Sequence, residues 1–377
     1  MIYFDNAATG GRKPDTVLTA VSSAIKVCAN PGRSGHKLSV SCATQVENCR
    51  NALDTLFDGY GFDRVVFTKN CTEALNIAIF GTLRQGDHAI VSCMEHNSVL
   101  RPLEYLQKQG VITYDVCPLR GSGANAELSP DDIRALLRPN TRLIAVTSAS
   151  NVTGYAPDLT AIRKILPESV LFLCDGAQGA GHIPLKMKEI GIDFLTLAGH
   201  KGMFGIQGSG ALLFSERIDP TPLMHGGTGS MSISLDTPDF YPDALEAGTL
   251  AFPAILSLLE GARYITLHQE EIAEKLLYLT DILIRKLSKL NAYSVYSAPN
   301  PCGIVAFRHH ALQSETIAQQ LSSKYTIAVR GGLHCAPLMH DGLGTLDGGL
   351  VRASLSHFNN EREIDALISA LIKIDNI

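Results

Sequence analysis

The sequence predicts an α/β protein in which a large domain holds a mainly parallel seven-stranded sheet and a smaller α+β domain follows at the C-terminal end. Two observations support this fold class. Short apolar runs alternate with helical patterns from about residue 60 to 215, and after Thr249 the chain changes to one long helical stretch followed by short strands and helices. Continuous apolar strands between helices are typical of parallel sheets that helices cover on both faces.

Seven apolar runs are the expected strands of the sheet. They are RVVF at 64–67, HAIVS at 88–92, VITYDV at 111–116, RLIAVTS at 142–148, VLFLC at 170–174, DFLTLA at 193–198 and GALLF at 210–214. Helix candidates lie between most of these runs, as in CTEALNIAIFGTL after the first one.

The C-terminal part has a different order of elements. Helical periodicity continues over 253–290, which predicts one long bent helix or two joined helices. Strands at GIVAFRH, TIAVR and LVRASL and a helix at SETIAQQLSSKY are expected after it. The last helix opens at Asn360, with Glu363 three positions on.

These patterns predict two domains that pack together, because no low-complexity linker separates them. We expect a large domain at 15–255. The segments 1–14 and 256–377 are expected to form the small domain, which carries the loop around Cys335.

Composition and charge argue against several classes of protein. Of the 377 residues, 45% are hydrophobic and 18% are charged, as in ordinary globular proteins. The net charge of −5 argues against nucleic acid and anionic membranes as partners. No apolar run reaches the roughly 18 residues of a membrane span, and the first residues lack the pattern of a signal peptide. The sequence therefore predicts a cytoplasmic protein.

Cysteine usage argues against a disulfide framework and against structural zinc, because the number of cysteines is odd and no CxxC occurs. Most of the cysteines are expected to be reduced and inert. Cys335 differs, since its loop, RGGLHCAPLMH at 330–340, is rich in glycine and is a poor place to bury a thiol. The nine cysteines are at positions 28, 42, 49, 71, 93, 117, 174, 302 and 335.

Polar side chains that follow the predicted strands are the candidates for a functional site, because ligands bind at the carboxyl ends of parallel strands. Asp175 follows VLFLC, and His200 and Lys201 follow DFLTLA. A lysine that condenses with an aldehyde needs a restricted pocket of low dielectric, which frees its lone pair. A pyridine cofactor needs a carboxylate at its ring nitrogen, and its phosphate needs donors at a helix N-terminus, such as NCTEALN with Thr72. The combination favours a site for pyridoxal phosphate (PLP).

The whole chain resembles the fold-type I, class V aminotransferase-like PLP enzymes, and within them the cysteine desulfurases and selenocysteine lyases. The matching motifs occur in family order. They are YFDNAAT at 3–9, EHNS at 95–98, NVTG at 151–154, DGAQ at 175–178, GHKG at 199–202, EAGT at 246–249 and RASLSHFNNEREID at 352–365. The short loop RGGLHCAPLM is similar to that of the group II (SUF-type) branch.

The resemblance implies a set of residues that hold PLP. Lys201 would bind the cofactor covalently, Asp175 would pair with the ring nitrogen, and Gln178 would bond the ring hydroxyl. His96 would stack on the ring and take part in proton transfer. The expected phosphate ligands are Thr72 at the helix start, His200, and Thr249 from the partner subunit of a homodimer. Cys71, next to Thr72, is a further expected cofactor-binding residue.

The resemblance also implies the substrate site and two departures from the family. Asn151 and Arg352 would hold the carboxylate of L-cysteine or L-selenocysteine, since a guanidinium binds a carboxylate bidentately. The segment RSGHKLS makes His36 a further candidate, and Arg330 lies at the start of the cysteine loop. Ala198 stands where Ser or Thr is usual, and NCT replaces a glycine-containing turn, so we expect weaker phosphate binding.

In this interpretation Cys335 is the nucleophile that takes sulfur from the substrate. It would form a persulfide, leave alanine, and pass the sulfur to an acceptor protein. Gly331 and Gly332 would give the loop its freedom, and Arg330 and His334 would stabilise the thiolate.

Several alternatives stay open at this point. A selenocysteine lyase would use the same residues, while another class V aminotransferase or lyase would have no use for Cys335. The least favoured alternative is a scaffold without catalysis. His334, Cys335 and His340 also suggest a metal site, but no fourth ligand is evident, so we expect no metal.

Overall fold

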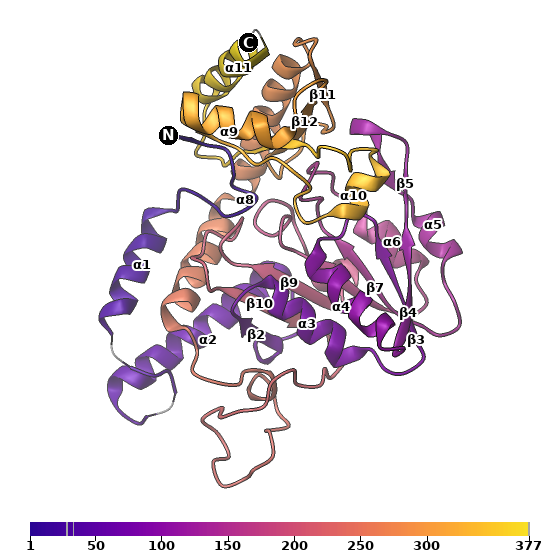
Figure 1. The fold of residues 1–377 in the computed structure, drawn as a ribbon. Helices are drawn as coiled ribbons and strands as arrows, with labels where there is room; N and C mark the ends of the chain where they lie inside the picture. The colour runs from indigo at the N-terminus through magenta and orange to yellow at the C-terminus, as the bar shows by residue number, and fades with distance from the viewer. Residues whose placement is uncertain (28, 33, 376–377) are drawn as a thin grey trace.

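The computed structural model describes residues 1–27, 29–32 and 34–375, and its central feature is a seven-stranded sheet (Figure 1). The strand order is β2-β10-β9-β8-β7-β3-β4. β10 runs antiparallel to β2 and to β9, and the pairs among β9, β8, β7, β3 and β4 are parallel. The strands are β2 (Val65–Thr68), β3 (Asp87–Ser92), β4 (Ile112–Cys117), β7 (Thr141–Thr147), β8 (Leu171–Asp175), β9 (Phe194–Ala198) and β10 (Gly210–Phe214). The predicted fold class and all seven predicted strands are confirmed.

Helices cover both faces of this sheet because its strands alternate apolar side chains between two layers. In β8, Phe172 and Cys174 belong to one apolar cluster, whereas Leu171 and Leu173 belong to the other. α3 and α4 pack with the second layer, through Leu75 among others. The helices of this part are α1 (Asp15–Lys26), α2 (Lys37–Phe57), α3 (Cys71–Thr82), α4 (Asn97–Lys108), α5 (Pro130–Ala135), α6 (Leu159–Ile165) and α7 (Met187–Ile190).

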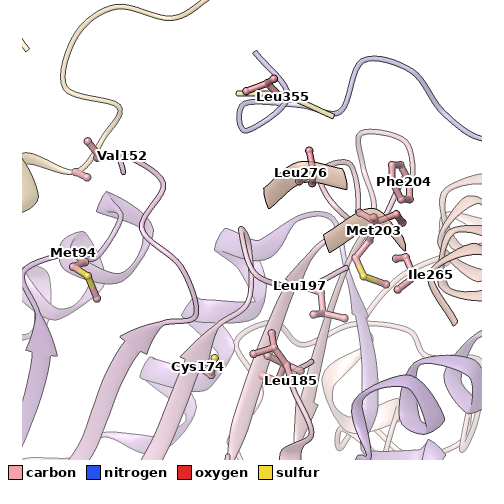
Figure 2. Packing of buried hydrophobic residues seen from close by; sticks show 14 of the residues in the cluster. Met94, Val152, Cys174, Leu185, Leu197, Met203, Phe204, Ile265, Leu276 and Leu355 are labelled. Carbon is pink, nitrogen blue, oxygen red and sulfur yellow. The ribbon is translucent and has the colours of Figure 1, made fainter. Parts of the chain in front are cut away.

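A single helix of 36 residues, α8 (Phe252–Leu287), joins this body to the C-terminal part, which settles the choice between one helix and two. α8 contacts α1 and α2, and it also contacts β11 (Tyr293–Val295) and β12 (Ile304–His309). All of these elements contribute to one apolar cluster, and Figure 2 shows a part of it in which Leu197 of β9 lies below Met203 and below Ile265 and Leu276 of α8. The large and small parts therefore share one core.

The C-terminal part contains a three-stranded sheet of order β11-β12-β14, with β14 at Val351–Ser354. The N-terminal strand β1 (Ile2–Tyr3) pairs with β13 (Ile327–Ala328), which brings the start of the chain to this part. The division at residues 14 and 255 stays a prediction. The remaining elements are β5 (Leu119–Arg120), β6 (Glu127–Leu128), α9 (Ser314–Tyr325), α10 (Pro337–Gly342), α11 (Glu361–Asp375) and the 3-10 turns η1 (Phe62–Arg64), η2 (Gly123–Asn125) and η3 (Asp243–Leu245).

Among the described helices, none combines the length and apolar character that a membrane crossing requires.

Candidate active site

The ends of the parallel strands surround a pocket of about 640 Å³, part of it open to solvent. β7, β8 and β9 and the first turns of α3 and α4 contribute its walls. Its lining brings together most of the side chains that the sequence singled out. They are Cys71, Thr72, His96, Asn151, Asp175, Gln178, His200 and Lys201, and Asn70, Leu75, Ser98, Thr147, Ala177 and Ala198 complete the wall.

Asp175 and Lys201 form the charged centre of this pocket. Asp175 ends β8 and is 3% exposed, and its Oδ1 accepts a hydrogen bond of 2.9 Å from the backbone N–H of Ala177. Lys201 follows β9, and burial lowers the pKa of its amine while the charge of Asp175 opposes this effect. The amine is therefore more readily neutral than an exposed lysine, and a neutral amine can act as nucleophile and base.

His96 presents a neutral ring to the pocket. Burial lowers the pKa of His96 to about 4, against a smaller opposing effect of Asp175. The backbone N–H of Ser98 donates to Nδ1 of His96 at 3.0 Å, so the ring proton resides on Nε2. The N-cap position of α4 thus fixes both the orientation and the tautomer of the ring.

The start of α3 forms the polar end of the pocket. Thr72 is exposed, its Oγ1 lies 2.8 Å from Oγ of Ser98, and the positive end of the helix dipole adds to their attraction for an anion. Nδ1 of His200 lies 3.1 Å from Oγ1 of Thr9. Ala198 lines this wall without a side-chain donor, as the sequence indicated.

Arg352 is fully buried beside Asn151 and has unused hydrogen-bonding capacity. Its Nη1 donates to the backbone oxygen of Asn151 at 2.9 Å, and its Nη2 pairs with Oδ1 of Asp5 at 3.1 Å. Within the part of the chain that the structure describes, Nε of Arg352 and Oδ1 of Asn151 have no hydrogen-bond partner. Buried polar atoms of this kind normally bind a ligand or water. Nε can donate to a carboxylate, whereas Oδ1 can only accept, so this corner fits a small molecule that offers a carboxylate beside a hydrogen-bond donor.

The loop of Cys335 reaches the same corner. Arg330 and Arg352 pair as an isolated antiparallel bridge, and Nδ2 of Asn151 donates to the backbone oxygen of His334 at 2.7 Å. Cys335 is half-buried, whereas the other described cysteines are all buried, and Nη2 of Arg330 lies 3.9 Å from its Sγ. The loop thus offers an accessible thiol next to a guanidinium.

One expectation about this loop is wrong. Burial lowers the pKa of His334 to about 2, and the charge of Arg352 acts in the same direction. His334 is therefore a neutral ring that is 2% exposed, and it gives Cys335 no positive charge. Of the two side chains that the sequence suggested, only Arg330 can place a positive charge beside Cys335.

Two further candidates, His36 and Thr249, lie apart from both the pocket and the loop of Cys335. His36 is exposed at the start of α2, where its Nδ1 accepts from the backbone N–H of Ser39 at 3.2 Å, so the chain does not bring it to its own site. Arg33 of the same motif and Cys28 lie outside the described residues. Thr249 lines a separate pocket of about 650 Å³.

Sequence reasoning missed two residues that hold the site together. Asp5 is the acidic partner of Arg352, and Ser98 orients His96 and contacts Thr72. Both stand inside motifs that the sequence shows, YFDNAAT and EHNS, but neither motif says which of its members makes the contact.

The residues of this pocket fit PLP. A volume of this size suits a small cofactor, Asp175 supplies a buried carboxylate, and Lys201 supplies an amine of lowered pKa. The start of α3 can hold a phosphate, and the partnerless Nε of Arg352 can bind the carboxylate of an amino acid. The described residues include no group of three or more His, Cys, Asp or Glu side chains placed to hold a metal ion.

Comparison with known proteins agrees with this site. The pattern of the aminotransferase class-V family matches residues 2–367, and the chain belongs to this family. Within the family, the chain is 31% identical to a probable cysteine desulfurase of Methanothermobacter thermautotrophicus, across 99% of this chain and 94% of the relative.

Solved structures show the same relationship. The apo structure of a cysteine desulfurase from Thermococcus onnurineus superposes with a TM-score of 0.89 at 28% identity, covering 99% of this chain and 94% of that one. A cysteine desulfurase from Escherichia coli superposes with a TM-score of 0.88 at 26% identity, covering 98% of this chain and 94% of that one.

Proposed function

We propose that this protein is a PLP-dependent cysteine desulfurase that converts L-cysteine to L-alanine and carries the sulfur as a persulfide on Cys335. The single observation that supports this most is the position of Cys335. It is the one described cysteine that is not buried, and Asn151, which lines the pocket of Lys201 and Asp175, connects that pocket to its loop. Relatives across the full chain are named as cysteine desulfurases.

Arg352 and Asn151 position the amino acid. The guanidinium of Arg352 binds the substrate carboxylate through its free Nε, because the geometry of a guanidinium matches a carboxylate. This contact fixes Cα in the pocket and directs the side chain of the substrate toward the loop of Cys335.

Lys201 moves the proton of the substrate. When bound, PLP supplies an electron sink for the carbanion that forms when Cα loses its proton. Asp175 keeps a negative charge at the base of the pocket, where it balances a protonated ring nitrogen. The amine of Lys201 accepts the Cα proton, since burial lowers its pKa.

Cys335 then takes the sulfur. Its thiolate attacks the substrate sulfur, a sulfur–sulfur bond forms, and the bond between Cβ and sulfur breaks with its electron pair remaining on the carbon fragment. Lys201 and the neutral His96 lie where they can return protons to that fragment, which leaves as alanine. The atoms balance as cysteine plus enzyme thiol giving alanine plus enzyme persulfide.

The sulfur then leaves for an acceptor protein, and the active form is a homodimer in which Thr249 completes the site of the partner subunit. The exposed position of Thr249, outside its own chain's PLP pocket, supports such a role. The half-buried thiol of Cys335 supports direct transfer to an external acceptor.

Alanine formation tests the activity. Purified protein with PLP and a thiol reductant is assayed with L-cysteine and with L-selenocysteine side by side. We expect alanine and sulfide from cysteine, and we expect Cys335→Ala to lose this activity while keeping the visible absorption of bound PLP. The matched control is Cys42→Ala, a buried cysteine of α2 that lies in none of the pockets described above. Unchanged cysteine turnover in Cys335→Ala would contradict the proposal, and selenocysteine turnover alone would indicate a selenocysteine lyase.

Borohydride reduction tests the site of the cofactor independently of turnover. We expect the reduced cofactor to be attached to Lys201 when peptides are analysed by mass spectrometry. Attachment to Lys13, a half-buried lysine whose Nζ donates to the backbone oxygen of His200, would overturn the assignment.

A further inference from the structure

Two consecutive residues at the tip of the cysteine loop have a strained backbone. The φ angles of His334 and Cys335 are 51° and 58°, in the left-handed region that favours glycine. Such strain costs free energy and persists only where surrounding contacts enforce it. The contacts that hold these two residues therefore decide where the thiol of Cys335 lies.

Both strained residues are held by hydrogen bonds to their backbone oxygens. Nδ2 of Asn151 donates to the oxygen of His334 at 2.7 Å, and the backbone N–H of Asn97 donates to the oxygen of Cys335 at 2.8 Å. Asn97 is the first residue of α4 and directly follows His96. Asn151 receives Nη1 of Arg352 on its own backbone oxygen. The bond from Asn97 thus links the loop to the segment of His96, and the bond from Asn151 links it to Arg352.

The flanks of the loop are fixed as well, which confines the strain to its tip. Arg330 exchanges two backbone hydrogen bonds with Arg352, at 3.1 and 2.7 Å. Nε2 of the buried His334 donates to the backbone oxygen of Leu350 at 3.1 Å. A Cβ at Gly331 would lie 2.7 Å from backbone atoms of Ser314, so the chain is tightly packed just before the tip.

We propose that Asn97, through its backbone N–H, and Asn151, through its side-chain amide, are positioning residues that hold the thiol of Cys335 against the substrate site. This inference rests on the proposed function for its catalytic consequence. Without either bond the tip relaxes out of the left-handed conformation, and the thiol moves away from the corner formed by Arg352. The thiol then reacts faster with external reagents and more slowly with the sulfur of a bound substrate.

A proline at position 97 removes one of the two bonds selectively. Proline is favoured at the first position of a helix, where its missing N–H leaves no intrahelical bond unmade. His96 already has the extended conformation that precedes proline, with φ −70° and ψ 154°. The ring of Asn97→Pro also occupies the space of the backbone oxygen of Cys335. Asn97→Ala is the matched control, because it loses the same side chain and keeps the N–H.

The first measurement is the alkylation rate of Cys335 by iodoacetamide, without substrate, followed by peptide mass spectrometry. We expect alkylation about fivefold faster in Asn97→Pro than in Asn97→Ala, the ratio that the loss of one hydrogen bond produces. Asn151→Asp, which keeps the shape but has no N–H to donate, and Asn151→Ala are expected to show a similar increase over wild type. The two Asn151 variants test the same loop independently of Asn97, so the proposal can still be tested if one of the variants folds poorly. Equal or slower alkylation in Asn97→Pro than in Asn97→Ala overturns the proposal.

The second measurement separates this inference from the proposed function. In alanine formation, we expect kcat of Asn97→Pro to fall about fivefold below that of Asn97→Ala with KM little changed, because the N–H of Asn97 contacts the loop and not the substrate. A wild-type enzyme that forms no alanine, together with faster alkylation of Asn97→Pro, refutes the function and leaves the positioning role. Alanine formation with equal alkylation and equal kcat in both Asn97 variants refutes the positioning role alone.

Discussion

Nη2 of Arg352 lies 3.1 Å from Oδ1 of Asp5, so the first residues of the chain hold the arginine that we expect to bind substrate. Arg352 is 1% exposed, and Asp5 is its only acidic partner among the described residues. The contact has a cost for binding, because a ligand carboxylate at Nε and the carboxylate of Asp5 at Nη2 share one guanidinium and their negative charges repel. The pair therefore links the stability of the fold to the occupancy of the site.

Replacing Asp5 by Asn is expected to lower the free energy of unfolding by about 1–3 kcal/mol, since it leaves a buried guanidinium without a counter-charge. L-alanine, the expected product, should raise the melting temperature of Asp5→Asn more than that of the wild type, because its carboxylate replaces the missing one. Chemical denaturation and thermal shift check the two statements. Asp281→Asn, which removes a surface partner of Arg285, is the control and should change stability by less than about 0.5 kcal/mol. An Asp5→Asn variant as stable as this control would contradict the prediction.

The contact between Asp5 and Arg352 also shows where sequence reasoning reaches its limit. Asp175 and Lys201 could be predicted as site residues, because local apolar patterns locate the strands and a parallel sheet brings the ends of its strands together. Asp5 and Arg352 are 347 positions apart, and no local pattern connects them. The pairing of β1 with β13 and the bridge between Asp5 and Ser354 of β14 bring Asp5 to the site.

The charge and the burial of individual side chains could not be predicted from the sequence either. His334 stands next to Cys335 and Arg330, which suggested a positive charge, but the packing of the loop buries the ring and keeps it neutral. His36 belongs to a motif that resembles an active-site segment, yet its own chain places it at the exposed start of α2. Burial and chain placement are tertiary properties, and neither follows from residue type or spacing.

Cys71 is expected to contribute to cofactor binding as a hydrogen-bond donor. Its Sγ lies 3.4 Å from Oδ1 of Asp175 and 3.3 Å from Oγ1 of Thr196. Burial and the charge of Asp175 raise the pKa of Cys71, so the group stays a thiol and can donate to the carboxylate. Removing the donor leaves Asp175 less well fixed for a ring nitrogen.

We expect Cys71→Ala to weaken PLP affinity about fivefold and Cys71→Ser, which keeps a donor, to stay within about twofold of wild type. Titration of the apoprotein with PLP, followed by absorption and fluorescence, measures both constants. Equal affinities of the alanine and serine variants would show that the thiol only fills space.

Glu95 is expected to make stability depend on pH. The side chain is fully buried, its Oε1 accepts from Oγ of Ser92 and from the backbone N–H of Thr147, and Oε2 has no partner among the described residues. Burial, with a further contribution from the charge of Asp175, raises the pKa of Glu95 to about 8 from an ordinary 4.5. Between these two pH values the folded protein keeps a proton that the unfolded chain has lost. The stability due to this proton is complete below 4.5 and is lost as the pH rises toward 8.

Glu95→Gln, which stays neutral at every pH, is expected to remove this dependence. The difference obtained by subtracting the free energy of unfolding of the wild type from that of Glu95→Gln should become more positive by about 1–3 kcal/mol between about pH 5.5 and about pH 8.5, because only the wild type loses this stability. Denaturant unfolding at both pH values gives the difference, and Glu270→Gln, an exposed residue of α8, is the control. A difference that does not change with pH would show that Glu95 is ionised in the folded protein throughout.

Gly261 in α8 packs so closely against the loop after Lys201 that we expect no larger residue to be tolerated at this position. A Cβ at this position would overlap the backbone oxygen of Met203, and a backbone atom cannot move aside as a flexible side chain can. We expect Gly261→Ala to lower the free energy of unfolding by about 2–3 kcal/mol through overpacking, and to weaken PLP binding by displacing Lys201. Gly35→Ala is the control, since a Cβ there meets no atom of the described residues within 4 Å, and its change in stability should stay within about 0.5 kcal/mol. Denaturant unfolding and PLP titration test the two effects, and a Gly261→Ala variant with wild-type stability would mean that α8 and this loop are packed less closely than the structure shows.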